Sequence, residues 1–488
     1  MVICNSVEEY IKEYDKNTPY EDLSFSEEYL YDELMDYLKN NDSNSDYCNL
    51  VGLLYFRKKD YDNAFIWFKK SADLKNSTGE YNTGLCYANG WGVKKDLEEA
   101  LDWYSLSAEK GNVSAQNNLG VLYDNGEIVE ENNEYAVMLY KKSAEAGDYL
   151  AMSNLGNMYY YGEGVKEDYE KAIYWYRKAI EGNDANAMVQ LGNMYYFGYG
   201  VNMDYWVAFN LYMQAARLDN VKGIYEVARC YYNGYGVETN YNKAYEYYKM
   251  AYEKGNLDAL NDLGLCYCNG FGVEEDYDMA LFYFMEASKN NNNVGTYNVG
   301  NMYYYGYGVE VDYNIAFKWF LEAAKNGYDV AMNKVGLMYY DGIGVEEDLD
   351  KAVYWYKKAV DCDNVCAVNN LGNCYYYGEG VEQDYEKAVE LYNMAVEAND
   401  IDACFNLANC YYKGNGVDLD VSKAVELYTI AANKGDSESQ YILGKIYAFG
   451  DDSFPEDVEK AIYWLNLAKE SGNEKASELL DELIKNSN

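Results

Sequence analysis

Apolar and small residues recur with a helical period along most of this chain. Between Ala151 and Tyr159 they occupy the first, fifth, eighth and ninth positions, a spacing that keeps side chains on one face of a helix. A second apolar stripe runs from Ala172 to Ile180. The pattern predicts two helices that are joined by a short turn and that each bury one face.

The same pattern returns every 36 residues, as the position of one glycine shows. From Gly156, taken as the anchor, steps of 36 residues reach Gly84, Gly120, Gly192, Ala228, Gly264, Gly300, Gly336, Gly372, Ala408 and Gly444, with a step of 32 back to Gly52. Two helices cannot bury a core alone, so each of these twelve units must stack on its neighbours. The sequence therefore predicts an all-α protein, an α-solenoid of helix pairs in one elongated array.

The turn between the two helices carries a GxGV motif, seen at Gly162, Gly164 and Val165. Glycine adopts left-handed backbone angles that other residues resist, so these glycines are expected to end the first helix. Asp168 follows at the position from which a side chain can accept the free amides of the second helix. A tyrosine three residues after the anchor occurs in all twelve units, Tyr159 in this one, and is expected to pack between helices.

The repeats do not cover the two ends of the chain. Residues 1–44 are predicted to form an N-terminal helical cap, in which Ser6 and Ser24 open helices at 7–14 and 26–38. Residues 45–476 form the predicted array, whose first unit lacks the GxGV turn; the third unit has Ile128 in place of the second glycine, so its turn must differ. Residues 477–488 are predicted to be a C-terminal capping helix and tail, and the helical pattern there already begins at Glu474.

Charge limits the partners that the chain is expected to bind. It has 82 acidic and 40 basic residues, a formal net charge of −42. This charge repels phosphate backbones and anionic membrane surfaces, whereas basic proteins are attracted. The expected partner is a protein or an extended peptide of basic character, and nucleic acid is not expected. The acidic residues also keep a long array soluble, which accounts for the charge without any partner.

The chain begins without a basic stretch followed by an apolar run, and it contains no run of about 18 apolar residues. Neither a secretory signal nor membrane insertion is therefore expected, and a cytoplasmic location is. Export by a route without such a signal stays open.

Eleven cysteines occur in the chain, and five of them share one position. Cys86, Cys230, Cys266, Cys374 and Cys410 lie two residues after an anchor, where other units have leucine, methionine or isoleucine. They are therefore expected to be core residues. Packed helices lie about 10 Å apart, which is too far for a disulfide between equivalent positions. The remaining cysteines lack a second ligand pair, so no metal site is expected.

Catalytic chemistry is poorly represented in the sequence. The chain has no histidine, which removes the commonest general base and the usual zinc ligand. Its glycine motif lies between helices rather than after a strand, so it is not expected to cradle a phosphate. Paired acids such as Glu274 and Glu275 lie in turns without an apolar pocket. The sequence predicts a protein that is not an enzyme and that has no cofactor.

The segment Leu155–Ala179, LGNMYYYGEGVKEDYEKAIYWYRKA, closely resembles the Sel-1-like repeat, a relative of the tetratricopeptide repeat. The resemblance covers about residues 45–476. It implies a right-handed superhelix of antiparallel helix pairs that acts as an adaptor or scaffold for protein complexes. One branch of the family is cysteine-rich, secreted and proposed to bind penicillin. A hydrolase of that type is the alternative, although regularly paired cysteines are missing here; an exported microbial effector that binds host proteins is another.

The first helix of each unit has a face that stacking leaves free. It contains the residues two before, one after and five after the anchor, which lie opposite the apolar positions. On this concave surface the candidate binding residues are Asn154, Asn157, Tyr161, Gln190, Asn193, Phe197, Asn298, Asn301, Tyr305, Asn370, Asn373, Tyr377, Asn406 and Asn409. Carboxamides both donate and accept hydrogen bonds, so a ladder of them can hold an extended peptide by its backbone. Asparagine and tyrosine are abundant throughout the chain, however, as coding sequence rich in A and T also produces.

Overall fold

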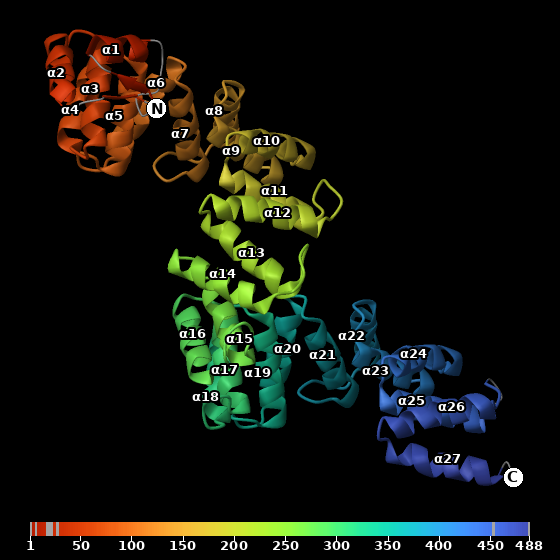
Figure 1. Cartoon of the computed structure of the whole chain (residues 1–488). Coiled ribbons are helices and arrows are strands. Elements are labelled where there is room, and N and C mark those ends of the chain that lie inside the picture. Colours follow the sequence, from red (N-terminus) through yellow and green to blue (C-terminus); the bar gives the residue numbers. More distant parts are fainter. Residues whose placement is uncertain (1, 5–6, 16–22, 26–28, 451–453, 487–488) are drawn as a thin grey trace. The chain divides into compact units, whose positions relative to one another are not determined.

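The computed structural model describes residues 2–4, 7–15, 23–25, 29–450 and 454–486, and within these ranges the chain is almost entirely helical (Figure 1). Its contacts divide the chain into two compact parts, Met1–Ala251 and Tyr252–Asn488, which we call the first and the second unit. Each of the twelve helix pairs is called a repeat. In both units the helices alternate between the two kinds that the repeat predicts. We call the first helix of each repeat the A helix and the second the B helix.

The array of the first unit is a series of helix pairs, in which odd numbers are A helices and even numbers are B helices. The pairs are α3 (Ser45–Arg57) with α4 (Tyr61–Asp73), α5 (Ser77–Asn89) with α6 (Leu97–Glu109), α7 (Val113–Asn125) with α8 (Asn133–Glu145), α9 (Tyr149–Tyr161) with α10 (Tyr169–Glu181), α11 (Ala185–Phe197) with α12 (Tyr205–Arg217), and α13 (Val221–Asn233) with α14 (Tyr241–Glu253). Each B helix up to α12 also packs on the next A helix, as α8 does on α9.

The second unit continues the same alternation. Its pairs are α15 (Ala259–Asn269) with α16 (Tyr277–Lys289), α17 (Asn293–Tyr305) with α18 (Tyr313–Lys325), α19 (Asp329–Asp341) with α20 (Leu349–Val360), α21 (Val365–Tyr377) with α22 (Tyr385–Glu397), α23 (Ile401–Lys413) with α24 (Val421–Asn433), and α25 (Ser437–Phe449) with α26 (Val458–Glu470). The final helix α27 (Glu474–Asn486) begins at the residue that the sequence pattern indicated and buries Ala476 and Leu480 beside Leu465.

A contact between the anchor glycine and one aromatic ring lies at the centre of the helix pair. Opposite Gly156 lies Tyr176 of the B helix, which is fully buried; a Cβ atom on the glycine would come within 2.6 Å of the ring. We call this aromatic residue the core ring. The core rings are Phe68, Tyr104, Tyr140, Tyr176, Tyr212, Tyr248, Phe284, Phe320, Tyr356, Tyr392 and Tyr428, and none is more than 3% exposed. The two helices approach closely because a glycine or alanine at the anchor leaves room for the ring.

The tyrosine three residues after the anchor packs at the edge of this core instead of at its centre. Tyr159 and Tyr195 are half-buried and lie against the apolar cluster of the first unit. The Tyr195 hydroxyl accepts a hydrogen bond of 2.9 Å from Arg177, and the Lys171 ammonium lies 5.1 Å from the centre of the Tyr159 ring. This tyrosine therefore joins the apolar core to the cations of the B helix.

The GxGV turn adopts the predicted geometry. Gly162 has a φ of +74° and ends α9, and Gly164 has a φ of +65°. The second glycine lies directly against the backbone of Asn133, at the start of the preceding B helix, so a side chain there would collide with it. Asp168 caps α10 by accepting a hydrogen bond of 3.0 Å from a backbone amide. In the third repeat Ile128 avoids positive φ, so that turn differs as expected.

The N-terminal region departs from the sequence prediction. Its elements are β1 (Val2–Cys4), α1 (Val7–Asp15), β2 (Leu23–Phe25) and α2 (Tyr29–Asn40). The two helices were expected, but the parallel strand pair, with Ile3 opposite Ser24, was not. Ser24 thus lies in a strand instead of opening a helix, and Ser6 lies outside the described residues. Strands of three residues are too short to show a period. The division into two caps and an array stays a prediction.

Two glycines of the second unit separate backbone strain from steric collision. Gly327 and Gly344 both have positive φ, but a Cβ atom would meet nothing within 4 Å at Gly327, whereas at Gly344 it would collide with the carbonyl of Tyr313. We expect Gly327→Ala to lower the free energy of unfolding by about 1 kcal/mol and Gly344→Ala by about 3 kcal/mol. Urea unfolding followed by circular dichroism measures both. Equal losses would show that the turn does not pack on the preceding B helix.

The buried thiols and phenols of the core predict that the protein loses stability at alkaline pH. Burial raises the pKa of Cys86 and Cys230 to about 12 and raises that of the core phenols of Tyr176 and Tyr212 beyond the usual range. The ordinary pKa is 9.0 for the thiols and 10.0 for the phenols. Because the folded protein raises these pKa values, each group stabilises the fold fully below its ordinary pKa and progressively less above it. For each such group the free energy of unfolding should fall by about 1.4 kcal/mol per pH unit.

Urea unfolding across the alkaline range measures this dependence, and tyrosinate absorbance reports ionisation. The absorbance of the core phenols should rise together with the loss of helix. Ionisation of all tyrosines while the helical signal and the free energy of unfolding stay constant would contradict the assignment of these rings to the core.

Candidate binding surface on the A helices

The A helices carry the predicted carboxamides on one face in both units. We name three positions of this face relative to the anchor: pre-anchor (two residues before), post-anchor (one after) and rim (five after). Together they form the amide face, whose predicted members are Asn154, Asn157, Tyr161, Gln190, Asn193 and Phe197 in the first unit and Asn298, Asn301, Tyr305, Asn370, Asn373, Tyr377, Asn406 and Asn409 in the second. The carboxamides are all half-buried, whereas the four rim rings are more than half exposed.

The pre-anchor asparagines bind the preceding repeat. Asn154 donates from Nδ2 to Oδ1 of Asn117, in the A helix before it, over 2.9 Å. The same bond joins Asn298 to Asn261, Asn370 to Asn333 and Asn406 to Asn369, at 2.8, 2.9 and 2.9 Å. The sequence analysis missed these acceptors; an asparagine 37 residues upstream of each donor is the signal that finds them. The pre-anchor amides therefore join neighbouring repeats, which leaves them less capacity for a ligand.

Four of the five post-anchor asparagines bind the core ring of their own repeat; the fifth, Asn301, lies in the repeat whose core ring is Phe320. Tyr176 donates from its hydroxyl to Oδ1 of Asn157 over 2.8 Å, and Tyr392 donates to Asn373 over 2.7 Å. The same bond joins Tyr212 to Asn193 and Tyr428 to Asn409. Burial raises the pKa of these phenols, so each hydroxyl stays protonated and can donate. Because Oδ1 faces the core, Nδ2 of the same amide faces away from it.

Three post-anchor amides keep an unused donor. Among the residues that the structure describes, Nδ2 of Asn157, Asn373 and Asn409 donates no hydrogen bond. None of these atoms is among the buried polar atoms that lack a partner, so each is open to solvent. Asn193 instead donates to Gln190 over 3.1 Å in its own helix, and Asn301 donates to the pre-anchor amide of its helix. The amide face thus presents N–H donors whose orientation is fixed by the core rings.

Other aromatic side chains hold the rim rings in place. Tyr161 packs edge-on against Tyr160 with ring centres 4.7 Å apart, and Phe197 stacks on Tyr199 at 5.5 Å. In the second unit the pairs are Tyr305 with Tyr307 at 5.7 Å and Tyr377 with Tyr376 at 4.9 Å. An exposed ring that a neighbour already holds loses little conformational entropy when a partner covers it.

Single residues interrupt the amide face. Arg229 occupies the post-anchor position of α13 and pairs with Glu226 at 2.9 Å. Lys334 occupies the pre-anchor position of α19, with its ammonium 3.8 Å from the centre of the Tyr304 ring. Leu265 is the post-anchor residue of α15. Each unit therefore offers short runs of amides instead of an uninterrupted ladder.

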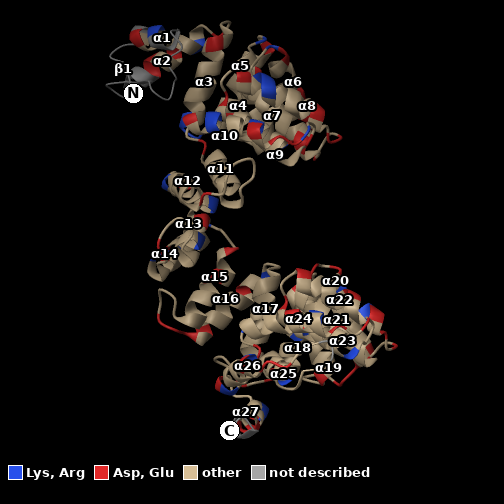
Figure 2. Cartoon of the chain, turned by 90° about the vertical axis from the view of Figure 1, so that its right-hand side faces the viewer, with Lys and Arg blue, Asp and Glu red and all other residues tan. Residues whose placement is uncertain are grey.

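The chemistry of the surface is that of hydrogen bonding and charge. In the described part of the chain, no group of three or more Cys, Asp or Glu side chains could hold a metal ion. Cys86, Cys266 and Cys410 are buried and their pKa is raised to about 12, so they are inert thiols at neutral pH. Acidic residues occur along the ribbon of both units, with lysine and arginine residues scattered among them (Figure 2). Over the described residues, every helix is too short or too polar to cross a membrane.

Comparison with known proteins agrees with this architecture. The Sel1 repeat description matches residues 43–76, 77–112, 113–148, 150–184, 185–220, 221–256, 257–292, 294–328, 329–364, 367–400, 401–436 and 437–473. Among solved structures, a protective antigen of uropathogenic Escherichia coli that displays an SLR fold is 30% identical, with a TM-score of 0.60 over 86% of this chain and 90% of that one.

A Sel1 repeat protein from Oxalobacter formigenes is 28% identical, with a TM-score of 0.46 over 63% of this chain and 88% of that one. No protein with a curated description matches. Twelve consecutive matches to one repeat, together with the fold shared with the Escherichia coli antigen, show that the chain belongs to the Sel1 repeat family.

Proposed function

We propose that this chain is a non-enzymatic scaffold that binds an extended segment of a partner protein along the amide face. The observation that carries the proposal is the set of outward-facing Nδ2 donors on Asn157, Asn373 and Asn409. Sel1 repeat proteins generally act as scaffolds in protein–protein interaction and are typically not catalytic. Family membership alone does not choose a surface, and the geometry of the amides supports this one.

An extended peptide suits donors at this spacing. Residues of an extended polyproline II segment advance about 3.1 Å each and repeat their orientation every third residue, and packed helices lie about 10 Å apart. Every third peptide carbonyl of such a segment can therefore accept a hydrogen bond from the post-anchor amide of a successive repeat. Asn373 in α21 and Asn409 in α23 are two such donors in adjacent repeats of the second unit. Contacts of this kind depend on the backbone of the partner, so they select an extended conformation more than a sequence.

Charge selects the composition of the segment. The formal net charge of −42 attracts basic residues and repels acidic ones. The cation at the post-anchor position of α13, Arg229, is neutralised by Glu226, so it does not offset this field locally. The partner segment is therefore rich in lysine or arginine, and its attraction is strongest at low ionic strength.

The cysteine-rich hydrolase alternative has less support. It requires regularly paired cysteines, whereas all ten cysteines for which the structure describes a side chain are free thiols. Most of them are buried at apolar positions, as Cys266 and Cys374 are. We therefore propose binding without catalysis.

The chain itself supplies a conservative exchange with which to test the donors. Where the post-anchor residue is Leu265, the core ring is Phe284, so leucine and phenylalanine form a natural pair at these two positions. The test variant makes this exchange in two adjacent repeats: Asn373→Leu with Tyr392→Phe, and Asn409→Leu with Tyr428→Phe. It removes two outward donors and leaves no buried hydroxyl without its acceptor.

We expect a fluorescein-labelled peptide of about ten alternating lysine and serine residues, long enough to span three repeats, to bind this variant more weakly than wild type. Two hydrogen bonds contribute about 2 kcal/mol, which corresponds to roughly thirtyfold in Kd. Fluorescence anisotropy at low ionic strength measures the affinity. The matched control is Tyr356→Phe, which removes a core hydroxyl opposite Leu337 and touches no amide; it should keep the wild-type affinity. An unchanged Kd in the test variant, with unchanged thermal unfolding, would rule out the amide face.

The pre-anchor amides should contribute to stability instead. Asn370→Ala leaves Oδ1 of Asn333 without its donor in the adjacent helix. We expect the free energy of unfolding to fall by about 1 kcal/mol. The control is Asn393→Ala, an exposed asparagine that bonds only within its own helix, and it should be close to neutral. Urea unfolding of both variants gives the difference, and equal values would mean that the bond between repeats has no net effect.

A further inference from the structure

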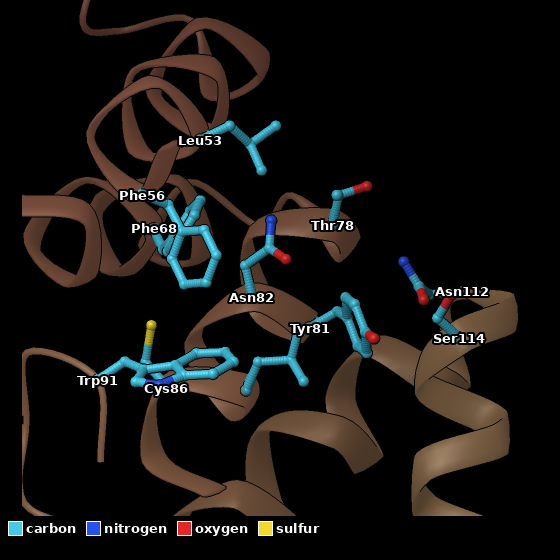
Figure 3. A pocket seen from close by; sticks show the side chains of 11 residues that line it. Leu53, Phe56, Phe68, Thr78, Tyr81, Asn82, Cys86, Trp91, Asn112 and Ser114 are labelled. Atoms are coloured by element: carbon cyan, nitrogen blue, oxygen red, sulfur yellow. The ribbon is translucent and has the colours of Figure 1, made fainter. Parts of the chain in front are cut away.

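A pocket of about 370 Å³ opens beside the first repeats of the array, between α3, α5 and the start of α7 (Figure 3). It occupies positions that belong to the amide face in later repeats. Leu53 and Leu85 are post-anchor residues, and Asn82 is a pre-anchor residue. The pocket is therefore the part of the same surface at which apolar side chains replace the post-anchor amides.

Aromatic rings line one end of the pocket. Phe56 meets Trp91 edge-on with ring centres 5.0 Å apart, and Trp91 also stacks on Tyr61 at 6.0 Å. Phe68, the core ring of the first repeat, has no hydroxyl, and the Cys86 thiol adds an uncharged wall. Because these rings are held by one another, the apolar end is formed before any ligand arrives.

Polar groups line the other end. Figure 3 shows Thr78, Asn112 and Ser114 across the pocket from the rings of Phe56, Phe68 and Trp91. The Tyr81 ring lies on the polar side, and Asn82 lies between the two groups. Asn82 donates to Asn49 over 2.8 Å, so its Oδ1 is left to accept. Oδ1 of Asn112 caps α7, so its N–H donors are left for a ligand. The eleven lining residues include no charged side chain.

The volume of the pocket and the chemistry of its lining together indicate which kind of ligand it can hold. An apolar cavity of about 150 Å³ holds one benzene molecule, so this pocket can hold an aromatic ring together with the peptide groups that flank it. Rings in the wall favour an aromatic guest because edge-to-face contacts add to burial. The amide oxygen of Asn82 and the amide donors of Asn112 suit the N–H and C=O of a peptide. A charged guest would lose its hydration without gaining a counter-charge.

We propose that this pocket anchors an aromatic side chain of the extended, basic partner segment. The inference rests on the proposed binding of that segment along the amide face. The net charge of −42 favours basic residues on both sides of this aromatic residue in the partner segment. Burying one aromatic ring contributes more affinity than one backbone hydrogen bond, so the aromatic side chain in the pocket fixes the register of the segment on the repeats.

Two labelled peptides test the proposal. Both consist of about ten alternating lysine and serine residues, and they differ only at one central position, which is phenylalanine or alanine. Wild type should bind the phenylalanine peptide about tenfold more tightly or better. In Leu85→Lys an ammonium group lies in the pocket, so this preference should fall to about twofold or less.

The matched control is Leu265→Lys, which makes the same change at a post-anchor position away from the pocket and should keep the preference. Arg229 occupies a post-anchor position naturally, so the fold tolerates a cation there. Thr78→Trp is a second pocket variant, since Thr78 is exposed in the first turn of α5 and a larger side chain there fills the mouth. It should abolish the preference as Leu85→Lys does.

N-acetylphenylalanine amide tests the pocket without the rest of the surface. Saturation-transfer NMR should detect its binding to wild type and its loss in both pocket variants. If neither peptide binds, but N-acetylphenylalanine amide binds wild type and does not bind the two pocket variants, the proposed pocket is supported and binding along the amide face is contradicted. If the alanine peptide binds and phenylalanine gives no gain, the amide face stands and the pocket fails. The pocket also fails if both pocket variants keep the preference, or if neither the peptides nor the amide bind.

Discussion

The rest of the structure depends on the contact between a small anchor residue and the core ring opposite it. Gly156 and Tyr176 illustrate it: the glycine lets the two helices approach, and the ring fills the space between them. The same approach brings the phenol hydroxyl to the first residue after the anchor, on the outer side of the A helix. One packing contact therefore stabilises the helix pair and, in four repeats, also orients an amide on its surface.

This contact couples the core to the surface through pairs of residues. A tyrosine core ring orients the post-anchor asparagine, as in Tyr392 with Asn373, so that the amide oxygen is occupied and the nitrogen is exposed. Where the ring is Phe284, no hydroxyl is available, and the post-anchor residue is Leu265. The ring does not dictate the residue, since Asn301 lies opposite Phe320 and Leu337 opposite Tyr356; where a tyrosine and an asparagine coincide, however, the buried hydroxyl orients the surface amide.

Periodicity and local chemistry made most of the fold predictable, whereas contacts between distant residues did not. The apolar stripes, the turn at Gly162 and the cap at Asp168 each depend on a few neighbouring residues, and the structure has them where expected. The strand pair of Ile3 and Ser24 depends on residues far apart and shows no period. The amides of the candidate site were found by position, but their partners were not, because the bond of Asn154 to Asn117 crosses from one repeat to the next.

The order of residues along the first unit also gives its surface a direction. The post-anchor position begins with Leu53 and Leu85 beside the aromatic pocket and continues with Asn157 and Asn193, which are held by core tyrosines. Side-chain amides that bind only backbone carbonyls can hold an extended segment in more than one register, because every residue of the segment has a similar carbonyl. A pocket at one end removes this freedom, since only one residue of the segment can fill it. In the proposed mode of binding, the irregular early repeats therefore supply the specificity that the regular amides lack.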